Sequence, residues 1–144
     1  MSYKFILLLV SVLLWVTACN SSENEPIDPN LTLSEQVDLL IEQNRYTTAL
    51  ELLYDKELDD PEIRSLLEKT HLNYGLHSMN TFDQTEMRTR MNNALSQFTE
   101  VLRLNPNNVV AREQISQILT IYDTIPGREP EPEVLEGLRE VGFE

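Results

Sequence analysis

Residues 91–106 of the chain read MNNALSQFTEVLRLNP, and this stretch decides the fold class. Its apolar residues recur at steps of three and four, a spacing that places them on one face of an α-helix. They are Met91, Ala94, Leu95, Phe98, Val101 and Leu102. Asn105-Pro106 ends this helix, because proline lacks the amide hydrogen that a continuing helix needs and disfavours helical geometry in the preceding residue.

An upstream stretch repeats this pattern: Tyr46, Ala49, Leu50 and Leu53 have the same spacing as Met91, Ala94, Leu95 and Phe98. Each alanine precedes a proline by 12 residues, and the two copies lie 45 residues apart, from Ala49 to Ala94 and from Pro61 to Pro106. A small alanine lets two helices approach closely, and the larger residue four positions on fills the space towards the next helix. The repeat therefore predicts helical hairpins that pack on one another.

This pattern resembles the tetratricopeptide repeat, a helical hairpin of about 34 residues. The resemblance covers roughly residues 32–122 and is most specific over 94–111. It implies an all-α fold, a short solenoid of helical hairpins, with an insertion of 11 residues around 77–88 that accounts for the longer spacing. The small position of the first helix departs from the family, since it holds Val37, His71 or Ser116 and never glycine. A generic helical bundle with the same core alanines is the alternative.

The helical pattern predicts about five helices over 32–125 and a short C-terminal helix within 126–144, after an acidic, proline-rich spacer. Thr32 and Glu35 have capping-box spacing, and Asp60-Pro61 is typical of a cap followed by proline in the first turn. The second helix is expected to carry the apolar stripe Tyr46, Ala49, Leu50, Leu53, Tyr54 and Leu58, and the third is expected to end between Gly75 and Asn80. No long window alternates as a strand does.

The N-terminus has the pattern of a targeting segment. Phe5 to Val16 form an apolar run that is too short to span a bilayer in the ordinary way, which favours a signal peptide over 1–18. The following Val16-Thr17-Ala18-Cys19 resembles the lipobox of bacterial lipoproteins, which implies cleavage before Cys19 and a lipid on its thiol. An ordinary secretory signal and an uncleaved anchor are the alternatives.

Residues 19–31 are then expected to be the lipidated cysteine and a flexible, acidic tether, because they are polar and contain two prolines. The resemblance implies an extracytoplasmic protein held at the cell envelope by its lipid. Asn20 stands where aspartate favours the inner membrane in some lipoproteins, so the outer membrane is favoured in an organism that has both.

The composition excludes several classes of function. With 24 acidic and 11 basic residues, the net charge is −13, which disfavours nucleic acid as a partner because phosphates would be repelled. One cysteine and two histidines are too few for a structural zinc site of the usual kind. His71 and His77 lie six residues apart, so they do not stack as paired ligands on one helix face. His71 is expected at a helix contact and His77 in a loop.

No nucleophile motif, phosphate loop or cofactor signature is found, and the acidic cluster around Asp59-Asp60 is interpreted as a capped helix junction. The sequence therefore predicts a non-enzymatic adaptor, without cofactor or metal, that binds a protein or peptide partner. By alignment with the repeat, the residues that line its groove include Ser34, Asp38, Glu68, Leu72, Glu113 and Gln117. Their acids favour a basic or neutral segment. A carboxylate-based enzyme or sugar-binding lipoprotein, and a purely structural spacer, are the alternatives.

Overall fold

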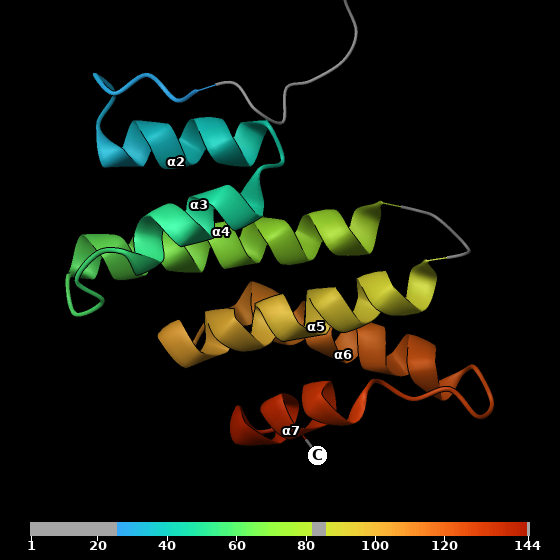
Figure 1. Cartoon of the computed structure of the whole chain (residues 1–144). Helices are drawn as coiled ribbons and strands as arrows, with labels where there is room; N and C mark the ends of the chain where they lie inside the picture. Colours follow the sequence, from blue (N-terminus) through green and yellow to red (C-terminus); the bar gives the residue numbers. More distant parts are fainter. Residues whose placement is uncertain (1–25, 82–85, 144) are drawn as a thin grey trace, which may run out of the picture.

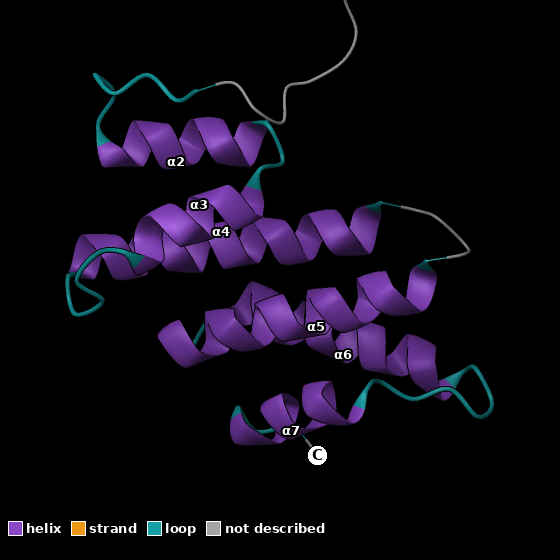
Figure 2. Cartoon of the chain, viewed as in Figure 1, coloured by secondary structure: helices purple, strands orange, loops and turns teal. Residues whose placement is uncertain are grey.

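The computed structural model describes residues 26–81 and 86–143, and within them the chain is helical, without a strand (Figures 1 and 2). The expectation of five helices and a short C-terminal one is confirmed for these residues. The helices are α2 (Leu33–Glu42), α3 (Tyr46–Tyr54), α4 (Pro61–Asn80), α5 (Met87–Leu104), α6 (Val109–Asp123) and α7 (Pro132–Glu140). The signal peptide, Cys19 and the first part of the tether lie outside the described residues.

Local sequence signals set where several helices begin. Thr32 and Glu35 form the expected capping box at the start of α2. Asp60 Oδ1 accepts a hydrogen bond from the amide of Glu62, and Pro61 is the first residue of α4. Asn108 caps α6 by accepting from the amide of Ala111. These side chains satisfy amide groups that have no partner inside the helix.

The helices form a stack with α2 at one end and α7 at the other, and α6 lies behind α5 in this view (Figure 1). The two longest, α4 and α5, lie side by side and share the most extensive contact in the molecule. Gly75 permits this approach, because a Cβ atom there would lie 2.6 Å from Cε1 of Phe98. The ring of Phe98 is fully buried.

Two hydrophobic clusters fill the stack. One joins α2, α3 and α4 through Val37, Leu53, Ile63, Leu66 and Leu67. The other joins α5, α6 and α7, and its largest fully buried members are Phe98, Leu95, Leu102, Ile115, Ile118 and Leu138. The repeated alanines, Ala49 and Ala94, are both fully buried, as their spacing predicted.

The C-terminal helix is part of the second cluster. Val134 and Leu138 of α7 are buried against α5 and α6, and Phe143 packs on the same cluster. The buried Asn92 of α5 receives hydrogen bonds from the Tyr122 hydroxyl and the Glu131 amide, at 3.3 and 3.1 Å. The segment that precedes α7 is thereby fixed to the body of the molecule.

Three local expectations are corrected. The second helix ends at Tyr54, so Leu58 lies in the loop before α4. His77 lies within α4, where its ring centroid is 5.3 Å from that of Tyr46, instead of in a loop. The helix that was expected from Met91 begins at Met87.

Among the described residues, no helix combines the length and the apolar composition needed to cross a bilayer.

Candidate functional site

A groove of about 220 Å³ opens between α3, α4 and α5 and the loop that joins α3 to α4. It is lined by Tyr54, Leu58, Asp59, Arg64, Leu67, His71, Glu100, Arg103 and Leu104. Four elements contribute because α3 and α5 both pack against α4, and the α3–α4 loop lies next to them. The groove exists only in the folded chain, since its walls are separated by up to 50 positions in the sequence.

Apolar side chains form much of the groove. Leu67 is buried and Leu104 half-buried. Tyr54 and Leu58 remain 51% and 49% exposed. Isolated exposed apolar residues are ordinary on protein surfaces, but these two lie together in one concave site. Such a site favours the binding of an apolar group.

Tyr54 is held in place although it is exposed. Its hydroxyl lies 3.0 Å from Nε2 of His71, and Nδ1 of His71 lies 2.7 Å from Oε1 of Gln97. Because the Gln97 oxygen is an acceptor, Nδ1 carries the ring proton, and Nε2 accepts the hydrogen bond that the Tyr54 hydroxyl donates. Both nitrogens of His71 are therefore occupied, which leaves neither as a base for chemistry in the groove.

This hydrogen-bonded chain continues along the α4–α5 contact. The Gln97 amide donates to Oδ1 of Asn93 at 3.3 Å, and the Asn93 amide donates to Oγ of Ser78 at 2.7 Å. His71 itself is 3% exposed, and its burial lowers the pKa below the ordinary 6.5, although Gln97 and Glu100 act in the opposite direction. The imidazole is thus neutral near pH 7 and serves to position Tyr54.

Charged residues form the rim of the groove. Arg103 pairs with Glu100 on its own helix and with Glu140 of α7, the latter at 2.6 Å. Arg64 donates from Nη2 to the carbonyl oxygen of Leu104 at 3.2 Å. Asp59 has no ion pair among the described residues. Asp59 and Arg64, one carboxylate and one guanidinium, are therefore the two charged groups of the rim without an ion pair among the described residues.

The size and chemistry of this groove suit a side chain better than a cofactor, because pockets for drug-sized ligands measure about 300–1,000 Å³. In the part of the chain that the structure describes, no three histidine, cysteine or carboxylate side chains come together as a metal site would require. The arrangement can bind an apolar group between Tyr54 and Leu58 and a polar group at the rim.

The groove residues expected from the sequence lie elsewhere, and none of them lines this groove. Asp38 of α2 forms an ion pair with Lys69 of α4 at 2.5 Å. Glu68 accepts hydrogen bonds from the side-chain amides of Asn105 and Asn108, at 2.9 and 2.8 Å. Its carboxylate thus fastens α4 to the turn between α5 and α6.

The remaining members of that set are dispersed. Leu72 packs against the second hydrophobic cluster, and Ser34 is half-buried in the first turn of α2. Glu113 and Gln117 are exposed on α6. Cys19 lies outside the described residues. The structure brings Asp38 close to α4 and Glu68 close to the start of α6, but it does not gather the set into one pocket.

Sequence reasoning missed the groove because it assigned Tyr54 and Leu58 to the core stripe of one long helix. The available signal was the loop itself. Asp55-Lys56-Glu57 is a charged segment that interrupts the stripe, and α3 ends directly before it. Tyr54 and Leu58 lie on either side of this interruption, so neighbouring helices bury them less than residues in the middle of a helix.

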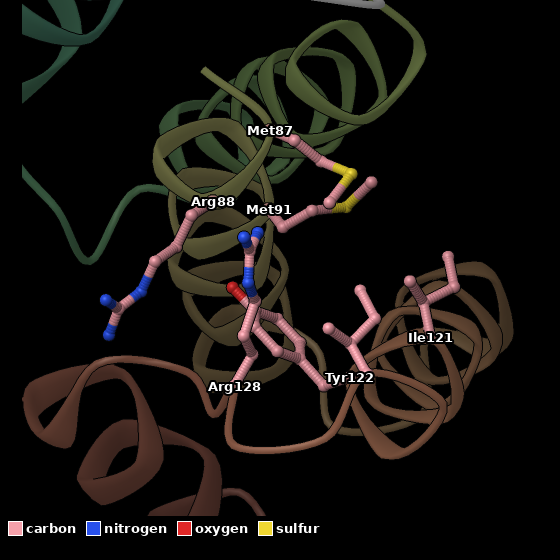
Figure 3. Close-up of a pocket in the computed structure, with 7 residues that line it drawn as sticks. Met87, Arg88, Met91, Ile121, Tyr122 and Arg128 are labelled. Atoms are coloured by element: carbon pink, nitrogen blue, oxygen red, sulfur yellow. The ribbon is translucent and has the colours of Figure 1, made fainter. Parts of the chain in front are cut away.

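A second, much smaller cavity of about 10 Å³ lies between the start of α5 and the end of α6. Met87 and Met91 line it from α5, and Ile121 and Tyr122 line it from α6 (Figure 3). Its volume is about that of one water probe, so it is a packing defect and not a ligand site.

Comparison with protein-family models, curated proteins and solved structures finds no match to this chain.

Proposed function

We propose that this protein is a lipid-anchored adaptor at a bacterial membrane surface, and that it binds a segment of a protein partner in the groove between α3 and α5. The observation that carries this proposal is Tyr54, which is half exposed and yet anchored through its hydroxyl to a buried histidine. Aromatic anchors of this kind dominate many protein interfaces, and one that is already ordered loses little entropy on binding.

The repeat-like architecture is part of the proposal. In a solenoid of helical hairpins, each helix packs on its neighbours in the chain and on the helix two positions away. The packing of α2 on both α3 and α4, and the burial of Ala49 and Ala94, support this arrangement for the first part of the chain. At the C-terminal end, the contacts of α5 with both α6 and α7 support the same arrangement.

The envelope location rests on the lipobox. Cys19 is the only cysteine of the chain and falls at the position where a bacterial lipoprotein carries its lipid. Replacement Cys19→Ser should abolish metabolic labelling with a fatty acid and release the protein from membranes. Labelling that persists in Cys19→Ser would remove the lipoprotein assignment without affecting the groove.

The docking proposal can be tested by site-specific photo-crosslinking in intact cells. A photoreactive amino acid at Leu58 should give a defined adduct, whereas the same probe at Val109, which is 64% exposed on α6, should not. The adduct at position 58 should diminish in Tyr54→Ala, because the wall of the groove is removed. Equal adducts at both positions, or an adduct insensitive to Tyr54→Ala, would contradict docking in this groove.

A further inference from the structure

We propose, on the basis of the function proposed above, that the segment bound in the groove carries a large apolar side chain next to a lysine or arginine. The apolar side chain lies between Tyr54 and Leu58, and the cation lies at the α3–α4 loop, where Asp59 is unpaired. This chemistry follows from the shape of the groove and from the distribution of charge around it.

The apolar part of the ligand is set by the contacts available. A side chain that enters the groove meets Leu67 and Leu104 and covers two half-exposed residues, Tyr54 and Leu58. The driving force is the removal of apolar surface from water on both partners. A polar side chain in the same place would lose hydration, and the apolar part of the lining offers it few partners.

The positive charge of the ligand is predicted from the acidic composition of the α3–α4 loop. Residues 55–60 hold four carboxylates and one lysine, and Leu58 and Asp59 of this loop line the groove. The carboxylate of Asp60 already caps α4. The carboxylate of Asp59 has no ion pair among the described residues, so a lysine or arginine of the ligand can pair with it.

The arginines of the groove do not reverse this preference. Arg103 already faces two carboxylates, Glu100 and Glu140. Arg64 has no ion pair among the described residues, but Nη2 is bonded to the Leu104 carbonyl. Arg64 therefore adds one positive charge to the groove, but residues 55–60 beside it hold four carboxylates and one lysine, so this end of the groove stays acidic. An acidic segment would meet the carboxylates of the loop and be repelled.

The test is a selection of random peptides, displayed on phage, against the full chain in purified form. We expect enrichment of peptides that carry leucine, phenylalanine or tryptophan beside lysine or arginine. The most enriched peptide is then synthesised with a fluorescent label, and its affinity is measured by anisotropy. Leu58→Glu should weaken binding about ten-fold or more, as loss of an interface anchor does.

The charge is tested separately with Asp59→Lys, an exposed loop position outside any helix. This variant should lower the affinity for the peptide by roughly two- to five-fold, and added salt should reduce this loss. Glu113→Lys changes the net charge equally on α6 and should leave the affinity unchanged. The two variants therefore separate a local ion pair from a long-range effect of net charge.

Two outcomes would overturn the inference at different levels. Enriched peptides that lack cations, or equal effects of Asp59→Lys and Glu113→Lys, would remove the basic specificity and leave docking in the groove intact. Peptides whose affinity survives Leu58→Glu, or a selection without enrichment, would remove the groove as the docking site as well. Circular dichroism of each variant checks that the helices are retained.

Discussion

The hydroxyl of Tyr54 lies 3.0 Å from Nε2 of His71, so a half-exposed residue of α3 is fixed by a buried residue of α4. His71 is fixed in turn by Gln97 of α5 at 2.7 Å. Three helices are thus joined by one imidazole, whose neutral form supplies both the donor and the acceptor. The order of the groove wall depends on this ring and on its protonation state.

The first prediction concerns pH. Burial lowers the pKa of His71 in the folded chain below its ordinary 6.5, so the unfolded chain binds the proton more readily. The contribution of neutral His71 to stability is therefore complete above about pH 6.5 and is lost as the pH falls from there to the folded pKa. The free energy of unfolding, measured by urea denaturation across this window, should decrease as the pH is lowered.

The matched control for this effect is the second histidine. His77→Gln should keep the decrease in stability, whereas His71→Gln should remove the part that belongs to His71. Parallel pH profiles for the wild type and His71→Gln would show that another group is responsible.

A second prediction concerns the hydroxyl of Tyr54. Tyr54→Phe leaves Nε2 of His71 without its donor, so the chain should lose about 1 kcal/mol of stability. Tyr74, which stacks on Tyr46 at 5.0 Å between centroids, offers the control because no hydrogen bond involves its hydroxyl among the described residues. Tyr74→Phe should be close to neutral by thermal or urea denaturation. Equal losses in the two variants would contradict the anchoring of Tyr54.

A third prediction tests the close contact between α4 and α5. In Gly75→Ala the new methyl group would lie 2.6 Å from the Phe98 ring, so the helices must separate or the ring must move. Overpacking of this kind costs about 1–3 kcal/mol, and the helix propensity of alanine recovers up to about 1 kcal/mol. We expect a net decrease in the free energy of unfolding.

Gly137→Ala in α7 is the matched control for this substitution, because its nearest atoms would be 3.4 Å away, on Arg103 and Thr99. There the helix propensity should dominate, and the variant should be neutral or slightly more stable. A stabilised Gly75→Ala protein would mean that α4 and α5 are less tightly packed than described.

A fourth prediction assigns a structural role to Glu68. Glu68→Ala leaves the amides of Asn105 and Asn108 without their shared acceptor, which should cost about 1–3 kcal/mol. Glu113→Ala, an exposed change on α6, should stay within about 0.5 kcal/mol. Comparable urea midpoints for the two variants would show that the carboxylate of Glu68 does not fasten the turn.

The sequence by itself determined the elements. Apolar residues at steps of three and four, the Thr32 and Asp60 caps and the prolines at 61 and 106 predict the helices of the structure, apart from the end of α3 and the start of α5. These signals act within one or two turns. The burial of Ala49 and Ala94 followed from the same periodicity. The signal peptide and Cys19 remain predictions of the sequence alone.

Only the tertiary structure decided which side chains meet. The periodicity placed Tyr54 and Leu58 in the core. The charged segment after Tyr54 is a local signal for the end of α3, but no local signal shows that both residues border a groove. Glu68 was likewise assigned to a docking face, whereas its carboxylate bonds to residues 37 and 40 positions away. Such contacts depend on how helices pack over long separations in the chain, which a local pattern does not encode.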